Sequence, residues 1–253
     1  MNPPLRLVRP FVFPALLLAA LEWWARTLGK GSDTVAPPSA AVQAFLRAAT
    51  DGSLLSATAF TLGSAAAGLA IGCMFGIALG TWLGLSTRAA AMGFLSIELL
   101  RPVPSVALIP LAMLVYGFGF RMEISVVAFA CAWPMLVLTQ AAVRQVEPRL
   151  LEVAHALQLQ PLARFCKIVL PAIVPRLFVA LRLGVAIALV VAVTVEIAAN
   201  PNGMGYAVMI AQQSLDPALM LAWLFWIGLV GFAINAASLR LQSWVARRMG
   251  ELA

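Results

Sequence analysis

The chain has 253 residues, of which 62% are hydrophobic and 11% are charged. Long, nearly uncharged runs recur along its whole length, which argues for membrane spans and against a soluble core. The formal net charge is +7, but the basic residues lie between the apolar runs and form no single cluster. Membrane topology therefore explains them better than nucleic-acid binding, and we expect no nucleic-acid partner.

Six apolar runs approach the ~20 residues that a helix needs to cross the hydrocarbon core. They predict an all-α, polytopic membrane protein of about six transmembrane helices, over 8–28, 59–85, 92–117, 123–143, 177–198 and 220–242. The first run resembles a secretory signal, but no clear cleavage site follows, so we interpret it as an uncleaved span. Arg101, Pro102 and Pro104 interrupt the third, which predicts either a short interfacial helix before a short span or one kinked helix.

The basic residues also predict the orientation of the spans. If the N-terminus is cytoplasmic, 12 of the 17 lysines and arginines fall in cytoplasmic segments and span ends. Four fall outside, and Arg101 lies within a span. Cytoplasmic loops carry the excess of basic residues, so we expect both termini in the cytoplasm.

The second run carries a glycine every four residues in GLAIGCMFGIALGTWLG. This spacing places five glycines on one helical face, where the backbone of another helix can approach closely. We expect that face to pack against a neighbouring helix and not against lipid. The five residues are Gly68, Gly72, Gly76, Gly80 and Gly84.

A polar insert, residues 144–175, separates the fourth and fifth runs. LLEVAHAL (150–157) is typical of a short helix, with Glu152 near the start, where a negative charge is favourable. Pro161 fits the first turn of a second short helix, and we expect Leu170-Pro171 to stop that helix. The joint between the helices carries apolar side chains among polar ones. They predict either a docking surface or a solvated loop whose apolar residues fold back onto the spans.

Residues 152–171, EVAHALQLQPLARFCKIVLP, keep the spacing E-A-A, three residues, G, nine residues, I, one residue, L-P. The identities differ at Val153 and Gln158 and agree at Glu152, Ala154, Ile168, Leu170 and Pro171. The stretch resembles the EAA loop of the integral membrane subunits of bacterial binding-protein-dependent ABC importers. RPVPSVALIPLAMLVYGFG (101–119) and TVEIAANPNGMGYAV (194–208) are similar to runs in permeases of the nitrate, sulfonate and taurine branch.

This resemblance implies a single transmembrane permease domain over 1–253, with a first span and outer linker (1–58) and a permease core (59–247). It implies a multi-pass protein of the bacterial inner membrane that forms a homodimer and contacts membrane lipids. It also implies two partners, a cytoplasmic ABC ATPase and a periplasmic substrate-binding protein. The solute would be a small anion such as a sulfonate, taurine or nitrate.

The resemblance further assigns ATPase coupling to the polar insert. Glu152 would anchor the first short helix, and other residues would fill a groove on the ATPase or pack the loop against the membrane base. These are Ala154, Leu157, Leu159, Leu162, Phe165, Ile168, Leu170 and Pro171. Gln158 stands where the family has glycine, which suits positive φ. Glutamine tolerates positive φ poorly, so we expect either an ordinary helix or turn there, or a contact of Gln158 with the partner.

Ionisable groups within the spans are functional candidates by default. Arg101 and Glu98 are three residues apart and predict either an ion pair or, for Arg101, a place in an anion pathway. Glu196 is the third pathway candidate, although bonding to the turn at 200–205 is the stronger interpretation. We find no histidine and no carboxylate pair within the spans, and the three cysteines are widely spaced, so we expect no metal site and no catalytic site.

The chain has no G-x-x-x-x-G-K-[ST] phosphate loop, so ATP chemistry must come from another polypeptide and no cofactor is expected. The alternative function is an ion-coupled secondary transporter. That class needs an acidic relay near mid-membrane and an internal repeat, and the sequence shows neither clearly.

Overall fold

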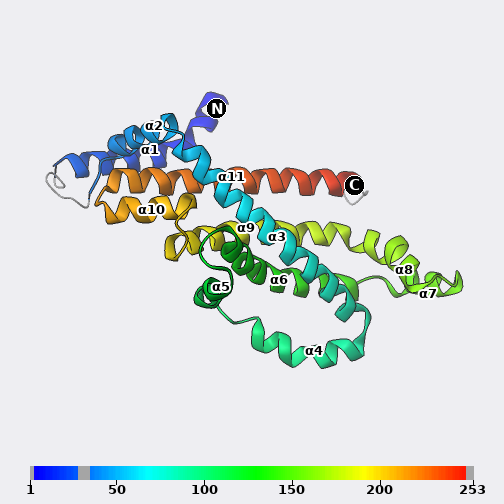
Figure 1. The fold of residues 1–253 in the computed structure, drawn as a ribbon. Helices are drawn as coiled ribbons and strands as arrows, with labels where there is room; N and C mark the ends of the chain where they lie inside the picture. The colour runs from blue at the N-terminus through cyan, green and yellow to red at the C-terminus, as the bar shows by residue number, and fades with distance from the viewer. Residues whose placement is uncertain (1–2, 28–34, 249–253) are drawn as a thin grey trace.

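The computed structural model describes residues 3–27 and 35–248, and all regular structure in these ranges is helical (Figure 1). Proline begins several helices because its missing N–H would be unpaired in the first turn in any case. The elements in chain order are α1 (Pro3–Thr27), α2 (Pro38–Thr50), α3 (Ser53–Leu85), α4 (Thr87–Leu100), η1 (Ser105–Leu108), α5 (Ile109–Tyr116), α6 (Phe120–Arg144), α7 (Pro148–Ala156), α8 (Pro161–Arg164), η2 (Phe165–Val169), α9 (Leu170–Ala198), α10 (Gly203–Gln213) and α11 (Pro217–Arg248).

Four described stretches are long and apolar enough to cross a membrane, where the sequence predicts six runs. They are Ser53–Leu85, Phe120–Arg144, Phe165–Gln213 and Pro217–Arg248. The predicted third span forms Thr87–Leu100 and Ser105–Tyr116, bent by 83°, and would make a fifth if counted as one span. The prolines therefore break this run into two helices, which is a sharper interruption than a kink. The predicted first span lies in α1, which is not among the four.

The glycine face of α3 packs directly against α6, as the four-residue spacing predicts. A Cβ added at Gly76 would lie 2.7 Å from the backbone oxygen of Ala132, and one at Gly80 would lie 2.5 Å from that of Leu136. These separations leave room for hydrogen only, so the two backbones are in contact over several turns. The helices α3 and α6 thus form the close-packed centre of the bundle, with α9 alongside them (Figure 1).

The polar insert projects from one end of the bundle, while the connection from α10 to α11 lies at the other end (Figure 1). Its second helix does not stop at Leu170-Pro171, so that prediction is wrong. The Leu170 N–H bonds to the carbonyl of Phe165, five residues back, which makes η2 a π-helical turn. This wider turn leads directly into α9 and places Pro171 in the first turn of α9, where no N–H is required.

Candidate functional site

The joint of the polar insert has the backbone geometry of a glycine, although the residue is glutamine. Gln158 has φ +49°, in the left-handed region. The Leu159 N–H donates to the Ala154 carbonyl at 3.0 Å, the six-to-one bond with which many helices end in a left-handed residue. The expectation of an ordinary helix or turn at Gln158 is therefore wrong. The conformation that the family's glycine favours is kept here, at a cost of about 1–2 kcal/mol for a residue with a Cβ.

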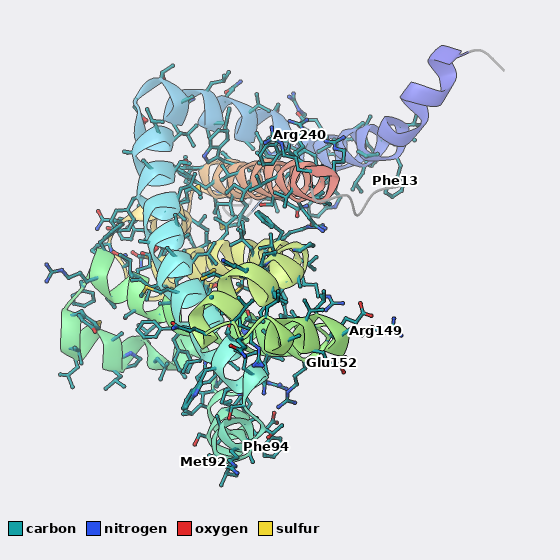
Figure 2. The ribbon with its side chains drawn as sticks, turned by 90° about the vertical axis from the view of Figure 1, so that its right-hand side faces the viewer. Phe13, Met92, Phe94, Arg149, Glu152 and Arg240 are labelled. Carbon is teal, nitrogen blue, oxygen red and sulfur yellow. The ribbon has the colours of Figure 1, made fainter. Side chains whose placement is uncertain are left out.

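The side chains at the tip of the polar insert point outward, whereas those at its base pack inward. Leu157 is 64% exposed, Glu152 and Gln158 are exposed, and Leu159 is half-buried. Figure 2 shows Glu152 and Arg149 on the outer side of α7. Ala154 is buried, and the side chain of Leu162 lies outside the described residues.

Phe165 does not lie at the exposed tip. It is half-buried against an apolar cluster formed by the end of α6 and the start of α9, with Ala142, Val143, Val146, Val169 and Ile173. Ile168 and Leu170 are half-buried as well, and Pro171 is exposed. Phe165 and Val169 of η2 share this cluster with the end of α6, so the base of the insert is packed against the bundle. Its exposed large apolar side chains are Leu150, Val153 and Leu157, of which Leu157 is the most exposed.

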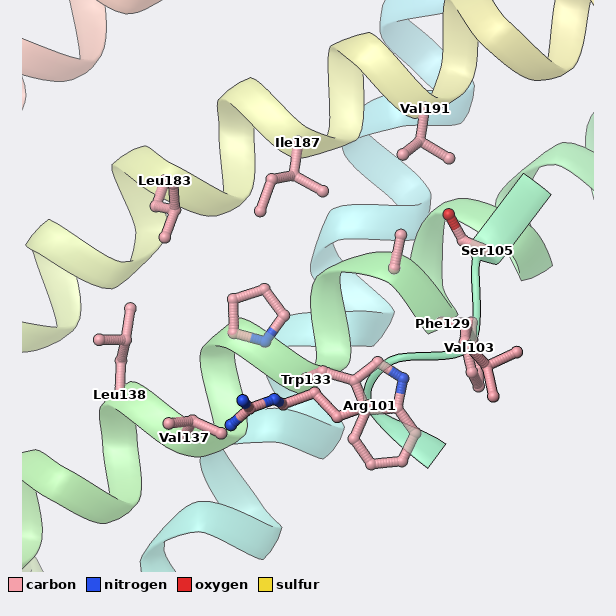
Figure 3. Close-up of a pocket in the computed structure, with 12 residues that line it drawn as sticks. Arg101, Val103, Ser105, Phe129, Trp133, Val137, Leu138, Leu183, Ile187 and Val191 are labelled. Atoms are coloured by element: carbon pink, nitrogen blue, oxygen red, sulfur yellow. The ribbon is translucent and has the colours of Figure 1, made fainter. Parts of the chain in front are cut away.

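A cavity of about 450 Å³ lies between α6, α9 and the segment that breaks the bent helix pair (Figure 3). Leu183, Ile187 and Val191 of α9 point toward α6 across it, and Trp133 lies on the opposite wall (Figure 3). Arg101 is the one charged side chain among its lining residues. A mostly apolar hollow with a single cation suits a small anion better than a neutral or cationic solute.

Arg101 also pairs with Glu98, as the ion-pair alternative predicts. The guanidinium Nη1 lies 3.7 Å from Glu98 Oε1, and the two side chains are 50% and 48% exposed. A half-exposed pair at this distance is weak. An anion in the cavity can therefore compete with Glu98 for the guanidinium at little cost.

A second polar site lies fully buried where α3, α6, α9 and the start of α10 meet. Glu123 of α6 accepts hydrogen bonds from the Ser64 hydroxyl and from the Asn200 amide. Glu196 of α9 accepts the Gly205 N–H at 2.7 Å through Oε2, which is the turn contact expected from the sequence. The carboxyl groups of Glu123 and Glu196 are neighbours in this cluster and interact with each other. All four of these side chains are buried.

The expectation that the spans hold no carboxylate pair is wrong, because Glu123 was missed. It lies at the edge of the fourth apolar run and carries no local motif. Its bonded partners are 59 and 77 residues away in sequence. The available signal was its position within FRMEISVV, where a lone acid enters an otherwise apolar helix.

The glycines of the stretch 194–208 make room for Glu196. A Cβ at Gly203 would lie 2.0 Å from Glu196 Oε1, and Gly203 has φ +93°. A Cβ at Gly205 would lie 2.3 Å from the Val193 carbonyl. Glycine is therefore needed at both positions of the G-x-G pattern, because a side chain at Gly203 would collide with the Glu196 carboxyl group and one at Gly205 with the backbone of α9. No group of three His, Cys, Asp or Glu side chains within the described ranges could hold a metal ion.

Comparisons with known proteins identify the family and the fold of the chain. Residues 68–251 match the sequence profile of a family described as "Binding-protein-dependent transport system inner membrane component". The chain is 29% identical over 225 residues to the putative aliphatic sulfonates transport permease protein SsuC of Bacillus subtilis, which covers 88% of this chain and 81% of the relative. It is 29% identical over 155 residues to the nitrate import permease protein NrtB of Synechococcus elongatus, covering 60% and 54%.

Among solved structures, an inward-facing conformation of the MetNI methionine ABC transporter matches with a TM-score of 0.63. The identity is 18%, and the match covers 73% of this chain and 92% of that one. At this identity the likeness shows a shared fold.

Proposed function

Because the chain belongs to the family of binding-protein-dependent transport system inner membrane components, we propose that it carries a small anion past Arg101. The family membership itself makes the chain the multi-pass permease subunit of an ATP-driven importer, which is not itself an ATPase. It also implies an ATPase and a binding protein as partners. The alternative of an ion-coupled secondary transporter finds no support in this family.

The cavity chemistry carries the proposal about the solute. Arg101 provides the one charge in a mostly apolar lining, and a weak ion pair with Glu98 holds its side chain until an anion competes. A planar guanidinium binds sulfonate, nitrate or carboxylate oxygens in a bidentate manner, whereas lysine acts as a point charge. The permeases named for sulfonates and nitrate among the relatives favour the same class of solute.

The proposal is tested by uptake in vesicles that contain this chain with its ATPase and binding protein. We expect Arg101→Gln to lower the uptake rate at least tenfold, with Arg101→Lys in between. Arg88→Gln is the matched control, because Arg88 is exposed at the start of α4 and does not line the cavity. Equal uptake rates for Arg101→Gln and Arg88→Gln would contradict a role of Arg101 in the anion pathway.

We also infer that the exposed tip of the polar insert inserts into a groove of the ATPase. Leu157 provides a large exposed apolar side chain beside Glu152 and Gln158, which suits an apolar groove with a polar rim. A cysteine at Leu157, in a Cys166→Ser background, should form crosslinks to the ATPase subunit. A cysteine at Met92, which is 84% exposed on α4 (Figure 2), should form none. Equal crosslinking at both positions would contradict the assignment.

In this proposal two copies of the chain share the membrane, with both termini and the polar insert in the cytoplasm. The excess of basic residues on that side supports the orientation. A membrane-impermeant thiol reagent should label a cysteine at Glu152 only when the cytoplasmic face is open to it. Labelling of this cysteine from the periplasmic side of intact cells would contradict the proposed cytoplasmic location of the polar insert.

A further inference from the structure

Among the side chains that the structure describes, no cation forms an ion pair with Glu123 or Glu196. The Glu22–Arg26 and Glu98–Arg101 ion pairs both lie elsewhere in the chain. Glu123 and Glu196 are both 0% exposed, in the interior of a membrane-spanning bundle. Two unpaired negative charges in contact, in such surroundings, are strongly unfavourable. The cluster must therefore reduce its charge by one of the means that its own atoms offer.

The hydrogen-bond donors in the cluster distinguish the two acids. Both oxygens of Glu123 receive a donor, one from Ser64 and one from Asn200. Glu196 receives the Gly205 N–H on Oε2, while its Oε1 is buried and has no donor. The Thr61 hydroxyl also lies beside Glu196, but Oε1 itself receives no hydrogen bond. Glu123 is thus arranged as an acceptor, and Glu196 has a free oxygen position.

We propose that the Glu123–Glu196 pair is a binding site for one proton, which Glu196 carries and donates within the cluster. The neutral Glu196 acid then hydrogen-bonds to the Glu123 carboxylate, and the cluster carries one negative charge instead of two. Two fully buried carboxylates offer acceptors only, so a direct hydrogen bond between these neighbours needs such a proton, for which Glu196 Oε1 is available. The bound proton joins α6 to α9, while Ser64 and Gly205 connect the pair to α3 and α10.

The site has a polar wall through which a proton can exchange. A second cavity, of about 350 Å³, is lined by Asn200 together with Tyr206, Phe118 and Met209. Asn200 therefore contacts the Glu123 carboxylate on one side and this cavity on the other. Tyr206 of α10 and the exposed Arg121 of α6 are the nearest ionisable side chains along those helices. The residues of α3 that face the pair, Thr61 and Ser64, do not ionise in this range.

Infrared difference spectroscopy on the full-length chain in lipid nanodiscs tests the proposal. At neutral pH the wild-type protein should show the carbonyl stretch of a protonated carboxylic acid, which shifts in D₂O. Glu196→Gln should abolish this band, while Glu98→Gln, the exposed control, should retain it. The absence of the band in the wild type, or its survival in Glu196→Gln, overturns the proposal.

Two further measurements remain decisive if Glu196→Gln folds poorly. Glu123→Gln leaves the acid in place but removes its carboxylate acceptor, so the band should persist at a shifted frequency, and an unshifted band contradicts the pairing. Because the folded state binds a proton that the unfolded chain releases, thermal stability of the wild type should fall as the pH rises above neutral. A wild-type stability that is flat or rises over this range also overturns the proposal. Both readouts are independent of transport.

Discussion

A single methyl group at Gly80 should separate α3 from α6. The added Cβ would lie 2.5 Å from the Leu136 carbonyl and 2.8 Å from Thr139 Cβ, where ordinary contact begins at 3.4 Å. The Leu136 oxygen belongs to a helix backbone and cannot rotate away, so the helices must move apart by several tenths of an ångström. Overpacking costs about 1–3 kcal/mol, and we expect the upper end because the neighbouring glycine contacts loosen together.

Gly228→Ala is the matched control, because nothing lies within 4 Å of a Cβ at that helical glycine. Both substitutions gain about 1 kcal/mol of helix propensity. Gly80→Ala should therefore be destabilising by about 2 kcal/mol and Gly228→Ala stabilising by up to about 1 kcal/mol. Thermal unfolding of the purified full-length chain in detergent measures the difference. Equal melting temperatures for the two variants would refute the close contact between α3 and α6.

Three more variants probe other contacts. Gln158→Gly should stabilise the joint of the polar insert by about 1 kcal/mol, because glycine adopts φ +49° without strain. Slower hydrogen exchange of the amides at 157–160 would measure this gain. An unchanged rate of transport-coupled ATP hydrolysis in the same variant would leave a specific contact of Gln158 with the ATPase unsupported. Thr58→Val removes the acceptor of the Trp226 Nε1–H at 2.8 Å and should cost about 0.6–2 kcal/mol in a melting experiment, whereas Thr194→Val, on an exposed hydroxyl, should cost less. Hydrogen bonds from the Ser53 hydroxyl and N–H lower the pKa of Asp51. The stability that they provide is present above the unfolded pKa of about 3.9 and is lost as the pH falls below it. Asp51→Asn should show a shallower acid transition than the wild type, and an identical transition would contradict this role.

Features that depend on short-range pattern were predicted well from the sequence. The glycine repeat in 68–84 predicted that this face packs against a neighbouring helix, because glycines spaced every four residues lie on one face of a helix. Pro161 begins the second helix of the polar insert as predicted, since proline at a first turn is a local constraint. The end of the insert was predicted wrongly, because the π-helical turn at 165–169 depends on packing against α6 and leaves no mark in composition.

Long-range contacts were beyond sequence reasoning. Glu123 is held in the fold by hydrogen bonds from Ser64 and Asn200, and no residue near Glu123 in sequence indicates these partners. At Gln158 a local preference misled the prediction. Glutamine disfavours positive φ, but the Leu159 N–H bond to the Ala154 carbonyl accompanies a positive φ at this residue. Tertiary bonding overrode local preference there at a modest cost.

The positions of these contacts indicate which wall of the Arg101 cavity can move. At one end, α6 and α9 share the apolar cluster around Val169 and Ile173 at the base of the polar insert. At the other end, some 40 Å away along the 29-residue α9, the Glu123–Glu196 contact joins the same two helices. A force applied to the polar insert therefore moves α6 and α9 together, and α3 follows through its glycine face. The third wall is the segment from Arg101 to Ser105, between two helices that meet at 83°. We therefore propose that the cavity opens and closes between this segment and the α3–α6–α9 unit, with Arg101 on the moving side.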